Sequence, residues 1–171
     1  MQAPHTQEEF VKLVQEHRAM LYKVCRLYCF SADDRQDLFQ EIVIQLWRSY
    51  PRFRGESKFS TWLYRIALNT AISNLRKQRI RPSPLDVNEM PTPLQDMSYP
   101  GEEEEQVQQL YAAIDRLSEI EKALVMLYLE DRSYEEMEEI LGINQNNLRV
   151  KMNRIREKLR KMTKEATYGI R

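Results

Sequence analysis

Apolar residues recur at helical spacing on both sides of Gly142, which divides the C-terminal part of the chain into two predicted helices. The residues before the glycine are Tyr134, Met137, Ile140 and Leu141, and those after it are Leu148, Met152, Ile155 and Leu159. Spacings of three and four residues place each set on one helix face. Ser133 and Glu136 form a capping box, S-x-x-E, at the start of the first helix. Gly142 suits the left-handed conformation that ends a helix, and Asn144 is a favoured N-cap for the second one.

The same periodicity predicts three helices in the N-terminal part: residues 6–29, 35–50 and 61–78. Residues 30–34 form the first turn, and Pro51 ends the second helix because proline lacks an amide hydrogen. Residues 52–60 form a loop with a glycine at its tip. Ser60 or Thr61 is expected to cap the helix that follows this loop.

A proline-rich acidic linker, residues 81–101, separates the two helical parts. It contains five prolines and no sustained periodicity, which is typical of an extended or disordered segment. Two helices follow it, over residues 102–117 and 119–129. Two more capping boxes pair a threonine or serine with a glutamate three residues later: Thr6 with Glu9, and Ser118 with Glu121. The predicted fold class is all-α, with two small helical domains at residues 6–80 and 102–165.

The composition is that of a globular chain without a membrane segment. Of 171 residues, 42% are hydrophobic and 30% are charged, enough to bury the cores of one or two small domains. No run of about 18 apolar residues occurs, so no membrane insertion is expected. The N-terminal sequence MQAPHTQEEF lacks the basic and apolar segments of a signal peptide. We therefore expect a cytoplasmic protein.

Charge is segregated along the chain although the net charge is zero. Residues 52–81 carry eight basic side chains and one acidic, a net of +7, and so do residues 145–164. Residues 86–105 carry seven acidic side chains and no basic one. Because local fields govern association more than net charge does, the two basic segments keep nucleic acid open as a partner.

Residues that serve enzymes and metal sites are scarce. The chain has no glycine-rich phosphate loop and no Ser/His/Asp set, so neither an enzyme nor a bound cofactor is expected. Cys25 and Cys29 are expected to be small buried hydrophobes in a reducing compartment. No metal site is expected, because one would need more ligands than His5 and His17 supply. A disulfide between residues four apart on a helix is disfavoured by its geometry.

A short acidic helix, a glycine turn and a long basic helix are typical of a helix-turn-helix whose second helix enters the DNA major groove. Side chains suited to base edges and phosphates occupy that helix and its cap: Asn144, Gln145, Asn146, Asn147, Arg149, Lys151, Arg154 and Arg156. The alternative is an ordinary helical hairpin with a solvated basic face. The asparagine cluster and the segregated charge favour DNA binding.

Basic and aromatic residues interleave in the loop and the start of the helix after it: Arg52, Phe53, Arg54, Lys58, Phe59, Trp62, Tyr64 and Arg65. This mixture suits a single nucleic-acid strand, with phosphates on the cations and unstacked bases on the rings. The alternative places the rings in the core and the arginines in solvent, and it is expected to hold for some of them. Trp62 is predicted to be partly buried.

Three blocks together closely resemble bacterial sigma factors: DLFQEI at residues 37–42, RFRGESKFSTWLYRIALN at residues 52–69, and SYEEMEEILGI with NRIREKLR within residues 133–160. Their order and spacing are most similar to the short extracytoplasmic-function (ECF) group of the sigma-70 family, which keeps sigma domains two and four joined by a linker. The resemblance covers almost the whole chain. It implies a factor that binds core RNA polymerase and directs promoter recognition, DNA melting and transcription initiation.

The resemblance also implies roles for individual residues. Those expected to dock on core polymerase are Asp37, Leu38, Gln40 and Glu41. Those expected to capture the melted non-template strand of the minus-ten element, or the duplex beside it, are Arg52, Arg54, Lys58, Phe59, Ser60, Thr61, Trp62, Arg65, Asn69, Arg76 and Lys77. The basic helix after Gly142 would read the duplex minus-thirty-five element, with Arg154 and Arg156 on phosphates. The family further implies an anti-sigma factor as a partner.

Glu138 departs from the family pattern, which usually has a small alanine at this position. A glutamate that faces the second helix needs a partner, and we expect Arg149 or Lys151, unless the side chain extends to water. The departure affects the expected packing of the two helices.

Two other binding functions are consistent with parts of the pattern. A repressor or activator that binds duplex DNA without polymerase would form a dimer on a palindromic site, but it has little use for a strand-binding loop. A protein-interaction module with both basic faces solvated would lack salt-dependent affinity for DNA.

Overall fold

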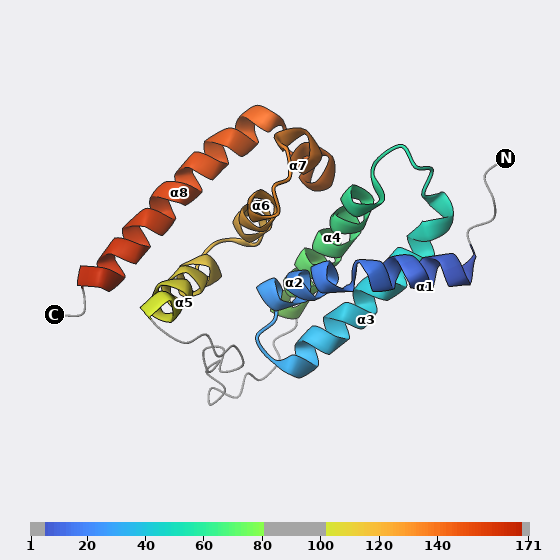
Figure 1. Ribbon diagram of the computed structural model, residues 1–171, viewed down its shortest axis with the longest axis horizontal. Coiled ribbons are helices and arrows are strands. Elements are labelled where there is room, and N and C mark those ends of the chain that lie inside the picture. Colours follow the sequence, from blue (N-terminus) through green and yellow to red (C-terminus); the bar gives the residue numbers. More distant parts are fainter. Residues whose placement is uncertain (1–5, 81–101, 169–171) are drawn as a thin grey trace. The chain divides into compact units, whose positions relative to one another are not determined.

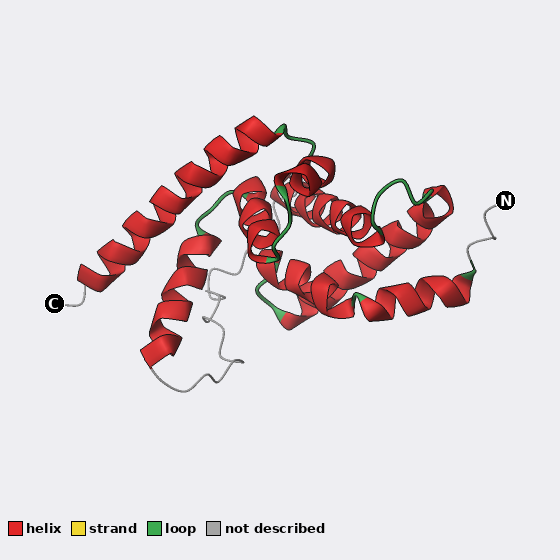
Figure 2. Cartoon of the chain, turned by 45° about the horizontal axis from the view of Figure 1, so that its top comes forward, coloured by secondary structure: helices red, strands yellow, loops and turns green. Residues whose placement is uncertain are grey.

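The computed structural model describes residues 6–80 and 102–168, which form helices joined by short turns and loops (Figure 1). Figure 2 shows no strand among these residues, so the all-α prediction is confirmed. The chain divides into two compact units, Met1–Pro91 and Thr92–Arg171. The predicted linker, residues 81–101, lies outside the described residues. No described helix has the length and apolarity needed to cross a membrane.

The first unit is a bundle in which α2 (Arg18–Tyr28), α3 (Ala32–Ser49) and α4 (Phe59–Ile80) pack against one another. Helix α1 (Gln7–Glu16) precedes α2 and contacts it. The core is built from buried residues that recur every three or four positions: Leu21, Val24, Leu38, Ile42, Leu46, Leu63, Ala67 and Leu68. One apolar stripe on each helix therefore suffices to make a single core.

The N-terminal helical segment is divided at His17, where φ is −106° and ψ is 14°. The ring atom Nδ1 of His17 lies 2.9 Å from the carbonyl oxygen of Leu13, and the ring packs on Phe59 with centroids 5.2 Å apart. The prediction of one unbroken helix is therefore wrong, because a ring from α4 engages the side chain at the break. The capping box of Thr6 and Glu9 is confirmed.

Helix α3 begins three residues earlier than predicted, because Ser31 caps it. The Ser31 hydroxyl accepts a hydrogen bond from the amide of Asp34 at 3.1 Å. Two acidic residues occupy the first turn, where the helix dipole favours negative charge. The helix ends at Ser49 and continues into the 3₁₀ turn η1 (Tyr50–Arg52), which contains Pro51.

Helix α4 also begins earlier than predicted, at Phe59. Its first turn closes when the amide of Trp62 donates to the carbonyl of Lys58 at 3.1 Å. Ser60 and Thr61 thus lie inside the first turn, and the prediction that one of them is the N-cap is wrong. The aromatic packing described below places this start, and helix propensity does not reveal it.

In the second unit, the long helix α8 (Gln145–Tyr168) packs against each of α5 (Glu102–Asp115), α6 (Glu119–Leu129) and α7 (Tyr134–Leu141). The predicted inward stripe of α8 is buried at three positions: Leu148, Met152 and Ile155. The capping boxes at Ser118 and Ser133 are confirmed. Gly142 ends α7 with φ at 70°, and the side-chain oxygen of Asn144 accepts a hydrogen bond from the amide of Asn147 at 2.9 Å. The predicted turn is therefore confirmed.

Candidate nucleic-acid interfaces

Three half-buried rings, Phe53, Phe59 and Trp62, form one cluster where the loop after η1 enters α4. Their centroids lie 5.0 Å apart for Phe53 and Trp62, 5.4 Å for Phe59 and Trp62, and 5.6 Å for Phe53 and Phe59. Tyr50 adds a fourth ring, 6.3 Å from Trp62. These separations are typical of favourable aromatic pairs. The partial burial predicted for Trp62 is confirmed, and each of the three rings keeps part of its surface accessible.

The loop beside this aromatic cluster turns at Gly55, whose φ of 72° lies in the left-handed region that side chains with a Cβ rarely adopt. Three cations of the loop are exposed: Arg52, Arg54 and Lys58. The loop therefore presents positive charge next to accessible aromatic surface.

Four predicted minus-ten residues share one face of α4, since their spacings are close to whole helical turns: Trp62, Arg65, Asn69 and Arg76. The last three of these and Lys77 are exposed, whereas Ser60 is half-buried. Thr61 is 3% exposed and belongs to the core side of the helix. Tyr64 is fully buried, so for this ring the core alternative holds. The structure thus brings most of the predicted residues together and separates Thr61 from them.

In the second unit the predicted minus-thirty-five residues surround the first turns of α8. Gln145 is half-buried and the others are exposed: Asn144, Asn146, Asn147, Arg149, Lys151, Arg154 and Arg156. Because Leu148 and Met152 point inward, Asn146 and Val150 point away from the core. Val150 is 48% exposed and was not among the predicted residues. This exposure could have been recognised in the sequence, because Val150 is apolar and lies outside the helical spacing of Leu148, Met152 and Ile155.

Glu138 of α7 is bound by Gln145, whose Nε2 donates to its Oε2 at 3.0 Å. The expectation that Arg149 or Lys151 is the partner is wrong. Arg149 instead donates from Nη2 to Oε1 of Gln145 at 3.5 Å and lies 4.9 Å from the centroid of the Tyr134 ring. The position of Gln145, the first residue of α8, puts its amide next to Glu138, and the longer arginine extends past both to the aromatic ring.

Farther along α8, two basic side chains are engaged by α6. The Arg156 guanidinium lies 4.9 Å from the ring centroid of Tyr128, and Nζ of Lys158 contacts Oε1 of Glu121 at 2.6 Å. The other oxygen of Glu121 accepts the amide of Ser118 at 3.0 Å. Burial acts to raise the pKa of the Glu121 carboxyl, but the hydrogen bonds from Lys158 and Ser118 and the lysine charge outweigh it, so the pKa is lowered.

The predicted polymerase-binding residues lie on α3. Asp37 and Gln40 are exposed, Glu41 is half-buried, and Leu38 is 4% exposed. A pocket of about 210 Å³ is lined by Asp37, Leu38 and Glu41 together with Asp34 and residues of α4. The structure therefore brings three carboxylates to one pocket of mixed polar and apolar lining and assigns Leu38 mainly to packing.

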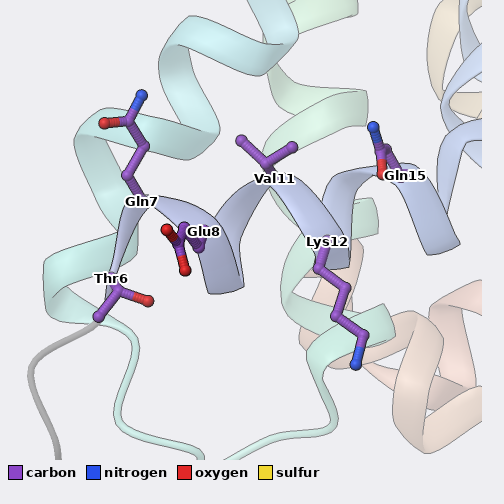
Figure 3. Close-up of a pocket in the computed structure, with 6 residues that line it drawn as sticks. All are labelled: Thr6, Gln7, Glu8, Val11, Lys12 and Gln15. Carbon is purple, nitrogen blue, oxygen red and sulfur yellow. The ribbon is translucent and has the colours of Figure 1, made fainter.

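A different hollow, drawn in Figure 3, runs along the outer side of α1. Its lining residues are Thr6, Gln7, Glu8, Val11, Lys12 and Gln15. All six are exposed and come from α1 and its N-cap, and none belongs to the residues predicted to bind DNA or polymerase. A surface lined by a single helix encloses no ligand, so this hollow receives no function.

Cys25 and Cys29 are free thiols, the first buried and the second half-buried. Burial, followed by the proximity of Cys29, raises the pKa of the Cys25 thiol to about 12, which keeps it protonated and unreactive. The prediction of a small buried hydrophobe is confirmed for Cys25. Among the residues that the structure describes, no group of three or more histidine, cysteine or acidic side chains is arranged to hold a metal ion.

Comparison with known proteins matches both units to sigma factors. The family model described as Sigma-70 region 2 matches residues 13–80, and the model described as Sigma-70, region 4 matches residues 107–159. The ECF RNA polymerase sigma-E factor of Haemophilus influenzae is 36% identical over 138 residues, covering 74% of this chain and 73% of the relative. The ECF RNA polymerase sigma-E factor of Escherichia coli K12 is 33% identical over 162 residues, covering 88% and 84%.

Two solved structures share the fold. The sigma factor RpoE of Bartonella quintana, in complex with the anti-sigma factor NepR, has a TM-score of 0.72 at 21% identity and covers 92% of this chain and 98% of its own. CnrH, in complex with the cytosolic domain of CnrY, has a TM-score of 0.65 at 20% identity, with 92% and 88% covered. At these identities the likeness concerns the fold alone. From the two family models and the sigma-E relatives it follows that the chain belongs to the ECF group of the sigma-70 family of RNA polymerase sigma factors.

Proposed function

We propose that the two units of this sigma factor divide promoter recognition between them, the first capturing the melted minus-ten strand and the second reading the minus-thirty-five duplex. The observation that carries this division is the difference between the two surfaces. The first offers clustered, partly accessible rings beside cations, and the second offers a polar helix start without exposed rings of its own. The protein works with core RNA polymerase in the cytoplasm, and the polymerase supplies the catalysis.

For the minus-ten element, Phe59 and Trp62 provide stacking surface for bases that have left the duplex. Extruding a base costs a few kcal/mol, and stacking on an aromatic ring contributes about 1–3 kcal/mol per base. Phosphate contacts offset the rest, from the loop cations Arg52, Arg54 and Lys58 and from Arg65 and Asn69 on α4. Arg76 and Lys77, farther along α4, bind the adjoining duplex. Ser60 lies beside the rings, and Thr61 supports them from the core side.

For the minus-thirty-five element, Asn146, Asn147, Arg149 and Lys151 are proposed to meet base edges, since asparagine pairs bidentately with adenine and arginine with guanine. Arg154 and Arg156 bind phosphates and fix the register of the helix. Asn144 is a cap rather than a reader, because its side-chain oxygen already accepts the amide of Asn147. The half-buried Gln145 lies next to these base-contacting residues in the same DNA-binding surface.

For core polymerase, the pocket lined by Asp37 and Glu41 is proposed to receive a basic side chain, with Gln40 exposed beside it and Leu38 holding the helix in place. An anti-sigma factor is proposed as a second protein partner. The support is that RpoE and CnrH were solved in complex with NepR and CnrY, and both share this fold.

The direct test is transcription with purified core polymerase, this protein and a fragmented genomic template. Discrete start sites that vanish when the protein is omitted are expected. The double variant Asp37→Lys, Glu41→Lys is expected to lose complex formation, and the double variant Glu8→Lys, Glu16→Lys at exposed positions of α1 serves as its charge-matched control. Absence of both a complex and a transcript would favour the repressor alternative, and a footprint of the free protein on a palindrome would then establish it.

A further inference from the structure

Four side chains join α7 to α8 beside the turn at Gly142. Tyr134 and Glu138 come from α7, and Gln145 and Arg149 from α8. Each pair is four residues apart and so lies on one face of its helix. The chain of contacts runs from Glu138 Oε2 to Gln145 Nε2 at 3.0 Å, and from Gln145 Oε1 to Arg149 Nη2 at 3.5 Å. It ends where the Arg149 guanidinium lies 4.9 Å from the centroid of the Tyr134 ring.

The carboxylate of Glu138 determines which way the amide of Gln145 faces. An ionised carboxylate only accepts hydrogen bonds, so Gln145 must present its NH₂ group to Glu138 and its carbonyl oxygen to the other side. That oxygen is the acceptor that Arg149 uses, and a guanidinium carries donors alone. If the amide were reversed, Nε2 would meet the arginine donor to donor. Glu138 therefore acts on Arg149 although the two do not form an ion pair.

We propose that Glu138 is a positioning residue that sets the base preference of the minus-thirty-five helix, acting through Gln145 on Arg149. This inference rests on the proposed function of α8 as the reading helix. An arginine ordered by a ring and an acceptor before binding loses less conformational entropy on the DNA. It also presents its planar fork in one orientation, and bidentate recognition of guanine depends on that orientation.

The test measures base preference rather than activity alone. Transcription by core polymerase is scored on a promoter library with a randomised minus-thirty-five element, for the wild type and for Glu138→Ala, Glu138→Gln and Arg149→Ala. A bidentate pair is worth about 5- to 150-fold in base preference. Arg149→Ala should flatten the positions that it reads by that factor. Glu138→Ala should lower the preference at the same positions by only part of that factor, since the arginine is loosened and not removed.

Two controls separate positioning from a structural tie between the helices. Glu138→Gln keeps a hydrogen bond to Gln145 but can present either its oxygen or its NH₂ group, so it should keep the wild-type melting temperature and lose part of the base preference. Glu139→Ala changes the neighbouring exposed residue of α7 and should leave them unchanged. Thermal melting of each variant is recorded alongside. If Glu138→Ala is too unstable to assay, Gln145→Leu replaces it. This substitution removes both hydrogen bonds at similar side-chain volume and should lower the base preference at the same promoter positions.

The inference is overturned if Glu138→Ala keeps the wild-type preference at every position that Arg149→Ala flattens. It is also overturned if Glu138→Ala lowers transcription from all promoters equally, in step with its melting temperature. Failure of the proposed function is seen separately, as wild-type protein that gives no promoter-dependent transcript or as Arg149→Ala with unchanged preferences. Either of those results removes the inference as well.

Discussion

The two basic segments carry the same net charge of +7, in residues 52–81 and 145–164, yet they are built in opposite ways. In the first unit the rings of Phe53, Phe59 and Trp62 pack on one another, and the cations stand beside them. In the second unit two rings from other helices each lie against an arginine of α8. These pairs are Arg149 with Tyr134 and Arg156 with Tyr128.

The difference shows that the placement of aromatic residues, and not charge, separates the two kinds of surface. A single strand exposes the faces of its bases, so a protein that binds it gains by offering rings. A duplex hides those faces and exposes edges and phosphates, so rings on the protein serve better by ordering arginines, Arg149 for base edges and Arg156 for phosphates in the proposed function. Four experiments test whether the two surfaces differ in this way.

The largest effect is expected for Trp62→Ala. Stacking of one base on an aromatic ring stabilises the complex by about 1–3 kcal/mol, so removing the ring should lower open-complex formation by about 5- to 150-fold. The base preferences at the minus-thirty-five element should stay unchanged. Permanganate reactivity of the melted strand, measured with core polymerase, reports the open complex. Tyr22→Ala is the control, since Tyr22 is 42% exposed and stacks on Phe39 away from this cluster. An equal loss in both variants would contradict a special role for the cluster.

Asn146→Ala should have the converse effect. Removing a base contact costs about 1–3 kcal/mol at one base pair of the minus-thirty-five element, with little change on a template that is already melted. Competition between promoters that differ at single positions measures this discrimination. Lys161→Ala, exposed farther along α8, should weaken binding equally across sequences. A uniform loss for Asn146→Ala as well would remove the asparagine from base reading.

Gly142→Ala and Gly55→Ala compare the two units through the same backbone conformation. Both glycines have φ near 70°, and an added Cβ would meet no atom within 4 Å at either one, so the cost is backbone strain alone. Each substitution should destabilise its own unit by about 1–2 kcal/mol. Urea denaturation measures the change. Asparagine tolerates this conformation, so Gly142→Asn should recover part of the loss, and no recovery would show that strain is not the cause.

The smallest effect concerns acid stability of the second unit. The pKa of Glu121 is lowered from its ordinary value of 4.5, so its contribution is present above that pH and is lost as the pH falls through the folded-state pKa. Glu121→Gln should remove this part of the acid sensitivity. The change should stay below about 1 kcal/mol because the Lys158 side chain is 50% exposed. Melting curves between pH 7 and pH 3 test it, and identical profiles would contradict the pairing.

Local rules predicted the helix-turn-helix well. The signals at Ser133, Gly142 and Asn144 act within four residues, and the structure contains all three features. The break at His17 and the start of α4 were missed because contacts with distant residues place them. The burial of Thr61 follows from the same early start of the helix. Sequence also named the family, while the roles of individual residues at polymerase and promoter are predictions that the experiments above address.

For Glu138, the sequence correctly indicated that the carboxylate needs a partner, but the predicted partner was wrong. Charge suggested an ion pair with Arg149 or Lys151, whereas position favoured Gln145, the first residue of α8. A charge pattern favours a cation as the partner of Glu138, but the turn at Gly142 brings the amide of Gln145 closest to the carboxylate. A neutral amide next to the turn therefore displaces a cation one or two helical turns farther along.

The contact between Lys158 and Glu121 has a consequence for the thermodynamics of DNA binding. Each phosphate that a protein cation neutralises releases condensed counterions, which sets the slope of affinity against salt. A lysine that is already paired at 2.6 Å in the free protein displaces no counterion unless it first leaves its carboxylate. Lys158, one of the eight basic residues in 145–164, therefore gains less from a phosphate than a lysine without a carboxylate partner would. If α8 binds DNA as proposed, the salt dependence of its affinity is expected to be weaker than its composition suggests.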